Sequence, residues 1–287
     1  MKPAAFEYCR PDTLEEAVAL LDEFAGDANV LAGGMSLGPM LNMRLARPAA
    51  LVDIKRIGGL DGVTIDAAAA RTGATLTQAR ALSHAELMKA VPLLGLALPW
   101  TGHFQTRNRG TLAGSVAHAD PSAETPLVLT TLGGEVELAS SRGTRRVTAN
   151  DFFVDVMTTS REPDEMIAAL IWPRPAPGAR HAFEEIAQRH GDFAIVACAV
   201  QAVVGADGML QSLALGLGGV ESRPLLAETS EFDGERADAR LAEAIADDIA
   251  ARVDPLTDHK ASADYRRGLV RTLGARVLGR AFADGAA

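Results

Sequence analysis

The chain has 287 residues, of which 48% are hydrophobic and 23% charged, and its formal net charge at pH 7 is −9. This composition predicts a globular protein with one large domain or two ordinary ones, and the acidic balance argues against a nucleic-acid partner. The two cysteines and six histidines form no closely spaced group typical of a disulfide framework or a metal site, so we expect no bound metal. The N-terminal sequence lacks a signal-peptide core and no apolar run could span a bilayer, which predicts a cytoplasmic protein without an integral membrane segment.

The first fifty-five residues predict a compact unit of strands and helices. Thr13 and Glu16 have the spacing of a capping box and begin a segment with one apolar face. Residues 29–31 and 51–55 are short apolar segments typical of strands, and the stretch between them keeps helical spacing as far as Pro48. The adjacent glycines that follow the first of these strands therefore lie at a strand-to-helix turn.

The rest of the chain predicts two further regions on either side of a linker. Residues 57–175 alternate strands with short helices and include a hairpin at 133–149. The linker is expected at 173–180, which holds three prolines and a glycine. Three β-rich segments and two helical segments follow, so residues 179–287 predict an α+β domain with a three-stranded antiparallel sheet backed by helices.

Two clusters of small residues are the main candidates for a binding site. The first is LAGGMS, residues 31–36, and the second is TLAGS, residues 111–115. Neither has the GxGxxG spacing of a Rossmann fingerprint. Glycine at the start of a helix still allows backbone N–H groups to approach a phosphate, and the helix dipole favours negative charge. A glycine pair is also common in plain turns, but two clusters on separate subdomains predict a long ligand with its pyrophosphate between them.

The longer sequences around both clusters resemble one known family. LAGGMSLGPMLNMRLARPAALVDI, residues 31–54, is similar to the first FAD-binding motif of the flavoprotein (medium) subunits of molybdenum hydroxylases. RNRGTLAGSVAHADPSAE, residues 107–124, is similar to the second motif, and RHGDFA, residues 189–194, to a C-terminal signature. The tail at 259–273 also resembles the family, so the likeness covers essentially the whole chain. Carbon monoxide dehydrogenase belongs to this family, and xanthine dehydrogenase carries a related domain.

The resemblance implies a fold and a set of FAD contacts. An α+β FAD-binding domain of the p-cresol methylhydroxylase type would occupy residues 1–175, with subdomains at about 1–56 and 57–175 holding the FAD. The C-terminal domain would cover part of the flavin. The first cluster would line one side of the pyrophosphate and the second cluster the other. The implied FAD-binding residues are Ala32, Gly33, Gly34, Met35, Ser36, Leu37, Thr111, Ala113, Gly114, Ser115, Asp120, Glu124, Met166, Ile167 and Phe193.

Several of these positions have more specific implied roles. Asp120 and Glu124 would accept hydrogen bonds from ribose or ribityl hydroxyls. The backbone at 164–167 would contact the isoalloxazine, and Phe193 would flank the ring.

Two positions depart from the family pattern. Ala113 stands where the second motif usually has a glycine, and its methyl group fits only if φ is negative. Glu184 stands where some relatives have a lysine near the flavin, so a cation at that position is absent.

No residue pattern in the chain predicts a substrate-activating centre of its own. The resemblance accordingly implies an electron-transfer subunit, with molybdopterin on a large partner subunit and two [2Fe–2S] clusters on a small one. Electrons would pass from those clusters through FAD to an external acceptor, in a dimer of heterotrimers. Two alternatives stay open: a self-sufficient FAD oxidase or dehydrogenase of the same fold, and a non-catalytic scaffold with a degenerate site.

Overall fold

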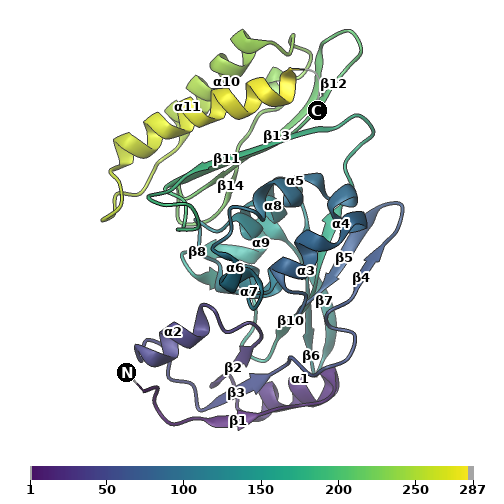
Figure 1. Cartoon of the computed structure of the whole chain (residues 1–287), viewed down its shortest axis with the longest axis vertical. Helices are drawn as coiled ribbons and strands as arrows, with labels where there is room; N and C mark the ends of the chain where they lie inside the picture. Colours follow the sequence, from purple (N-terminus) through teal and green to yellow (C-terminus); the bar gives the residue numbers. More distant parts are fainter. Residues whose placement is uncertain (1, 284–287) are drawn as a thin grey trace.

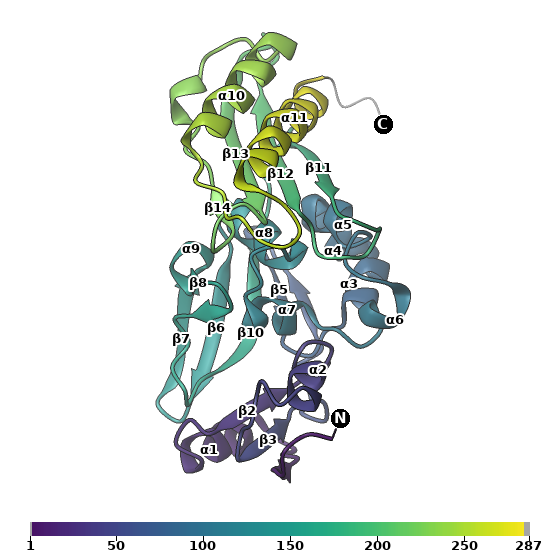
Figure 2. The same cartoon turned by 90° about the vertical axis from the view of Figure 1, so that its left-hand side faces the viewer.

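The computed structural model describes residues 2–283, so the last four residues of the expected C-terminal domain lie outside the described part. Three parts follow one another along the long axis of the molecule (Figure 1). An N-terminal subdomain lies at one end, a central subdomain in the middle, and a C-terminal domain with two long helices at the other end (Figure 2). No helix within residues 2–283 is both long enough and apolar enough to cross a membrane.

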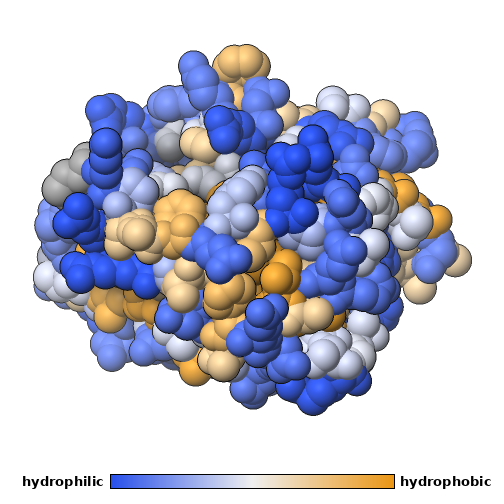
Figure 3. Space-filling model, turned by 90° about the horizontal axis from the view of Figure 1, so that it is seen from below, coloured by the Kyte–Doolittle hydropathy of each residue, from blue (hydrophilic) through white to orange (hydrophobic). Residues whose placement is uncertain are grey.

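The N-terminal subdomain is a small parallel sheet with a helix packed on it. Its elements are β1 (Glu7–Cys9), α1 (Leu14–Glu23), β2 (Ala28–Leu31), α2 (Leu37–Asn42) and β3 (Ala50–Asp53), and the strand order is β1-β3-β2. The hydroxyl of Thr13 accepts the amide of Glu16 at 3.1 Å, which confirms the predicted cap of α1. Seen from this end of the molecule, apolar surface gathers on an otherwise largely hydrophilic face (Figure 3).

The helix after the glycine pair is shorter than the apolar spacing predicts. α2 ends at Asn42 rather than continuing toward Pro48. Arg44 has a φ of 60°, a left-handed conformation that ends the helical run. The prediction was wrong because apolar spacing alone does not record where the backbone turns.

The central subdomain is built on a five-stranded antiparallel sheet of order β4-β5-β10-β6-β7. Its strands are β4 (Val63–Ile65), β5 (Ala69–Gly73), β6 (Glu135–Ser140), β7 (Gly143–Thr148) and β10 (Met166–Pro173), with a short ribbon of β8 (Phe153–Asp155) and β9 (Thr158–Thr159). Its helices are α3 (Gln78–Ser83), α4 (Ala85–Ala90), α5 (Pro92–Ala97), α6 (Phe104–Arg107), α7 (Leu112–His118), α8 (Glu124–Thr131) and α9 (Ala149–Phe152). The pairing of β6 with β7 confirms the predicted hairpin.

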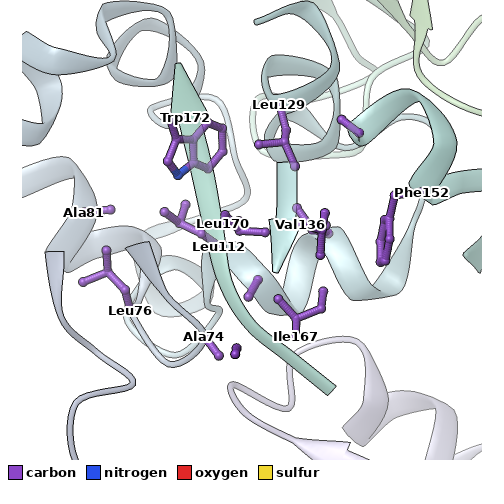
Figure 4. Close-up of a cluster of buried hydrophobic side chains, with 14 of the residues drawn as sticks. Ala74, Leu76, Ala81, Leu112, Leu129, Val136, Phe152, Ile167, Leu170 and Trp172 are labelled. Atoms are coloured by element: carbon purple, nitrogen blue, oxygen red, sulfur yellow. The ribbon is translucent and has the colours of Figure 1, made fainter. Parts of the chain in front are cut away.

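Strand β10 runs through the middle of this subdomain's core. Seven of its eight residues are buried, as expected for a central strand covered on both faces. Trp172, Leu170 and Ile167 lie along it among side chains from the surrounding helices and strands (Figure 4). The buried indole N–H of Trp172 donates to the Thr72 hydroxyl at 2.9 Å, so its polar atom is satisfied.

The C-terminal domain is a four-stranded antiparallel sheet backed by two helices. Its elements are β11 (Arg180–Ile186), β12 (Val196–Val204), β13 (Leu210–Gly218), β14 (Leu225–Leu226), the 3₁₀ turn η1 (Ser230–Phe232), α10 (Ala239–Arg252) and α11 (Ala263–Phe282). The predicted three-stranded sheet therefore needs correction. The fourth strand, β14, has only two residues, too few to show strand alternation in a sequence.

The two faces of this sheet pack against different partners. Cys198 and Val200 on β12 belong to the core shared with α10 and α11. Ala197 and Ala199, which alternate with them, belong to the core of the central subdomain. The sheet is therefore buried on both sides, and one side lies on helices α5 and α8 of the central subdomain (Figure 2).

Candidate functional site

A cavity of about 710 Å³ is lined by residues from all three parts of the molecule. The N-terminal subdomain contributes the segment that joins β2 to α2, and the central subdomain contributes α7 and the start of β10. The C-terminal domain contributes Gly191 and Phe193 from the loop after β11. Cofactor and small-molecule sites typically have volumes of roughly 300–1,000 Å³, and this cavity falls in that range.

The structure brings nearly all the sequence-predicted site residues to this one cavity. Its lining includes Ala32, Gly33, Gly34, Met35, Ser36, Leu37, Thr111, Ala113, Gly114, Ser115, Glu124, Met166, Ile167 and Phe193. Asp120 is the predicted residue that is not in the lining. Its carboxylate instead accepts the amide of Ser122 at 2.8 Å and shapes the turn before α8.

The two glycine-containing segments meet directly, backbone against backbone. A Cβ added at Gly33 would lie 2.2 Å from the carbonyl oxygen of Arg109 and 2.8 Å from the Cα of Gly110. Gly34 has a φ of 72°, which favours glycine over any other residue. Gly33 is therefore needed for the close contact between the subdomains, and Gly34 for the turn. The loop that they form is a wall of the cavity.

The second cluster forms the start of α7. The hydroxyl of Thr111 accepts the amide of Gly114 at 2.9 Å and caps the helix. Ala113 lies in the first turn, buried, and is absent from the residues with positive φ. Its methyl group is accommodated by ordinary helical backbone, so the departure from the usual glycine carries no strain here.

Arg161 is a cavity residue that the motifs did not identify. Its Nη1 donates to the carbonyl oxygens of Glu165 at 2.7 Å and Glu162 at 3.0 Å. Its Nε and Nη2 donate to no protein group within residues 2–283. Burial lowers the pKa of this guanidinium, while the nearby carboxylates of Glu165 and Asp164 oppose that shift.

The carboxylates near Arg161 are each paired with a different arginine. Arg145 binds Glu165 through two hydrogen bonds of 2.6 and 2.7 Å, and Arg142 pairs with Asp164. Arg161 is consequently a half-buried cation without an ion-pair partner in the described chain. A buried charge of this kind is costly unless an anion meets it, which makes it a candidate ligand group.

Glu124 is the carboxylate in the cavity wall. It is 3% exposed and begins α8. Burial raises the pKa of this carboxyl to about 7, against the lowering effect of its own backbone N–H and the Thr101 side chain. His118 at the end of α7 is the third titratable side chain among the described residues that line the cavity.

Met157 lines the cavity with a strained backbone, and Ala119, which directly follows the cavity residue His118, is strained as well. Met157 and Ala119 have φ values of 51° and 53°, which are uncommon for residues other than glycine. The amide of Met157 donates to the carbonyl of Ala119 at 3.1 Å, so a backbone hydrogen bond links the two positions with positive φ. Such strain often marks binding sites, and nothing in the local sequence signals it.

The C-terminal loop places an aromatic side chain at the cavity. Phe193 is 43% exposed, and the ammonium of Lys260 lies 5.7 Å from its ring centre. The same loop is anchored by an edge contact between His190 and Trp100, with ring centres 5.5 Å apart. The domain after the linker therefore contributes directly to the cavity.

Glu184 points away from the cavity. Its carboxylate pairs with Arg276 and Arg280 on α11. The cation that some relatives carry at this position is therefore missing here, and Arg161 enters the cavity from a different element. No group of three or more histidine, cysteine, aspartate or glutamate side chains that could hold a metal occurs in the part of the chain described.

Comparison with known proteins gives a consistent result over the whole chain. Residues 4–175 match the family of FAD-binding domains in molybdopterin dehydrogenases. Residues 181–281 match the C-terminal domain family of carbon monoxide dehydrogenase flavoproteins.

Individual relatives match over nearly their full length. The 6-hydroxypseudooxynicotine dehydrogenase complex subunit alpha of Paenarthrobacter nicotinovorans is 35% identical over 98% of this chain and 96% of that one. The carbon monoxide dehydrogenase medium chain of Hydrogenophaga pseudoflava is 32% identical over 99% of both chains.

Solved structures agree in fold. A chain of quinoline 2-oxidoreductase from Pseudomonas putida 86 superposes with a TM-score of 0.94 at 34% identity, covering 98% of both chains. A chain of the Hydrogenophaga pseudoflava carbon monoxide dehydrogenase gives a TM-score of 0.94 at 33% identity, covering 99% of both chains. The chain therefore belongs to the FAD-binding medium subunits of the molybdenum hydroxylases, a family of oxidoreductases.

Proposed function

We propose that the cavity binds FAD without a covalent link, with the pyrophosphate between the segments at 31–36 and 111–115. The main support is the combination, in one cavity, of two backbone-lined segments with Arg161, a half-buried cation that has no ion-pair partner within residues 2–283. An extended dianionic ligand satisfies both features, since backbone N–H groups and Arg161 can each meet a phosphate. The cavity's volume and apolar walls also suit a dinucleotide.

The remaining predicted contacts are proposed on the same basis. Glu124 and Phe193 both line the cavity, and we propose that Glu124 accepts a ligand hydroxyl and that Phe193 flanks the flavin ring. Met166 and Ile167 supply the apolar start of β10. In this proposal residues 1–175 form the FAD-binding domain and residues 179–287 the C-terminal domain that completes the cavity.

We propose that the chain works as an electron-transfer subunit rather than as a complete enzyme. When bound, FAD supplies the redox chemistry that side chains lack, and the protein contributes binding, orientation and charge. Among the described residues that line the cavity, only Arg161, Glu124 and His118 can carry charge. We identify no arrangement there for activating a substrate carbon.

The proposed partners are supported by the printed names of relatives that are single subunits or chains, among them the 6-hydroxypseudooxynicotine dehydrogenase complex subunit alpha and the carbon monoxide dehydrogenase medium chain. We propose a large molybdopterin-binding subunit, where substrate is oxidised, and a small subunit with two [2Fe–2S] clusters. Electrons would pass from those clusters through the FAD of this chain to an external acceptor, in a cytoplasmic dimer of heterotrimers.

The test compares flavin reduction in the isolated chain and in the complex. The chain reconstituted with FAD should show a flavin spectrum and be bleached by dithionite, yet stay oxidised with an aldehyde or an N-heterocycle. The complex purified from the native host should show the same flavin bleaching when its substrate is added. A Gly34→Val chain, which cannot adopt a φ of 72° without strain, serves as the control that retains no flavin.

Two results would contradict this proposal. Absence of a flavin spectrum after reconstitution of the wild-type chain would remove the FAD site. Stoichiometric bleaching of the isolated chain by a substrate would instead support the self-sufficient oxidase of the same fold.

A further inference from the structure

Lys260 is a cation that lies beside an aromatic side chain of the cavity. It belongs to the turn between α10 and α11, far from Phe193 in the sequence. Its ammonium lies 5.7 Å from the centre of the Phe193 ring, within the roughly 6 Å over which a cation is attracted to an aromatic face. No carboxylate within residues 2–283 forms an ion pair with it. The ring is therefore the group that meets this charge in the described chain.

The carboxylate next to Phe193 has another partner. Arg189 donates to Asp192 at 3.0 Å, in the same loop. That hydrogen bond is the main cause that lowers the pKa of Asp192, and the charges of His103 and Lys260 act in the same direction. Because Arg189 occupies this carboxylate, the Lys260 ammonium stays over the ring instead of forming an ion pair with the loop.

The turn that carries Lys260 is held by its own hydrogen bonds. The carboxylate of Asp258 accepts the amide of Lys260 at 2.9 Å and that of Ala261 at 3.0 Å. The amide of Asp258 donates to the carbonyl of Ala261 at 3.0 Å, which closes the turn. The backbone of Lys260 is therefore fixed, although its side chain is long.

Arg266 joins this turn to the loop that carries Phe193. It is 3% exposed and forms an ion pair of 2.7 Å with Asp258. Its Nη1 also donates to the carbonyl of Ile195, two residues after Phe193, and to that of Gly219. Hydrogen bonds from a charged donor are stronger than those between neutral groups. This one guanidinium therefore links the turn to the loop.

The ring of Phe193 is the least fixed part of this arrangement. The backbone before it rests on the central subdomain, because Gly191 has a φ of 86° and a Cβ there would lie 2.9 Å from the ring of His103. The backbone after it is bound by Arg266. The side chain itself is 43% exposed, so few protein atoms restrict its ring. A cation over the ring supplies a restriction that the rest of the loop does not.

We propose that Lys260 is a positioning residue for FAD, which holds the Phe193 ring in place at the cavity. This inference rests on the proposed FAD site, in which Phe193 flanks the flavin ring. A ring that is already ordered in the free chain loses less freedom when the flavin binds against it, so FAD binds more tightly. Lys260 does not line the cavity, so it acts through Phe193 and not on the ligand itself.

The test is a double-mutant cycle on the FAD dissociation constant of the full chain. Lys260→Met removes the charge and keeps an unbranched side chain, and Phe193→Leu removes the aromatic face. Lys260→Met alone should raise the dissociation constant about two- to fivefold, the size expected for an exposed cation–π contact. In the Phe193→Leu chain the same substitution should have no effect. An equal rise in both backgrounds would overturn the proposal, because Lys260 would then act on FAD without Phe193.

Two further variants serve as controls. Lys260→Arg keeps a cation that can lie over an aromatic ring, so its dissociation constant should stay within about twofold of wild type. Lys89→Met removes an exposed charge on α4, outside the cavity lining, and should leave FAD binding unchanged. A rise in Lys89→Met as large as that in Lys260→Met would contradict a specific contact, since the net charge of the chain would explain both.

A measurement without FAD keeps this proposal apart from the proposed function. The apoprotein is labelled with para-fluorophenylalanine, and Phe193→Leu identifies the fluorine resonance of Phe193. Lys260→Met should shift this resonance and Lys260→Arg should restore it, whereas Lys89→Met should leave it in place. An unshifted resonance in Lys260→Met overturns the contact even where FAD binds. Failure of wild type to bind FAD overturns the proposed function, and the resonance then still decides whether Lys260 holds the ring.

Discussion

Arg161 illustrates how neighbouring ion pairs leave one cation available for a ligand. Three arginines and two carboxylates meet near the start of β10, and Arg142 and Arg145 occupy the two carboxylates. Arg161 is then held in place by backbone carbonyls, and two of its three nitrogens have no hydrogen-bond partner within residues 2–283. The sequence could not reveal which of the three arginines lacks an ion-pair partner, because that depends on which side chains meet after folding.

Replacing Arg161 should weaken FAD binding strongly. A hydrogen bond to a charged group contributes about 1.5–3 kcal/mol, so Arg161→Met should raise the FAD dissociation constant by roughly tenfold or more. Fluorescence titration of the apoprotein with FAD measures this change. Arg142→Met, which breaks the exposed neighbouring pair, should leave the dissociation constant within about twofold of wild type, as expected for a surface ion pair. Equal losses in both variants would contradict a direct contact of Arg161 with FAD.

At the scale of elements, the start of α7 serves both stability and the site. Thr111 caps this helix in the same way that Asp238 caps α10, where the amide of Leu241 donates to the Asp238 carboxylate at 2.9 Å. The two caps differ in location, since α7 borders the cavity and α10 lies on the far side of the C-terminal sheet. They therefore offer a matched pair of substitutions.

Thr111→Ala and Asp238→Ala should have similar effects on stability and different effects on FAD. Loss of a helix N-cap costs about 1 kcal/mol, so each variant should lower the free energy of unfolding by about that amount in urea titrations. Only Thr111→Ala should also weaken FAD binding, because it loosens backbone that faces the cavity. Equal FAD affinity in the two variants would mean that the start of α7 does not touch the ligand.

Elements with a strong local pattern were predictable from the sequence, and others were not. The Thr13 cap and the β6–β7 hairpin follow from local spacing and are confirmed. The early end of α2 depends on the backbone at Arg44, and β14 forms only because a neighbouring strand is present. Likewise the glycine clusters could be recognised as motifs, whereas Met157 reaches the cavity through tertiary contacts.

At the scale of the whole molecule, the cavity lies where the N-terminal subdomain, the central subdomain and the C-terminal domain meet. Residues from both subdomains and from the C-terminal loop line it, so one ligand can touch all three parts. The sheet of the C-terminal domain is also buried against the central subdomain, which joins their cores. The family motifs indicated a ligand between two subdomains, but the burial of Glu124 in the cavity wall emerged only from the fold.

Binding of FAD should therefore stabilise the molecule as one unit. A ligand present at a hundred times its dissociation constant adds about 2.7 kcal/mol to the free energy of unfolding. Calorimetry with and without FAD should show a single transition moved to higher temperature. Two transitions, of which FAD moves only one, would mean that the ligand does not join the three parts.

The direct contact between Gly33 and the backbone at Arg109 and Gly110 has a consequence for how a ligand enters. Because these loops touch backbone to backbone, the fold fixes the two walls of the site relative to one another. Phe193 lines the cavity and is partly exposed, so we expect a ligand to enter past this side chain. The rate of association would be limited by entry through this opening rather than by hinge motion of the subdomains, and most of the ordering cost is met during folding.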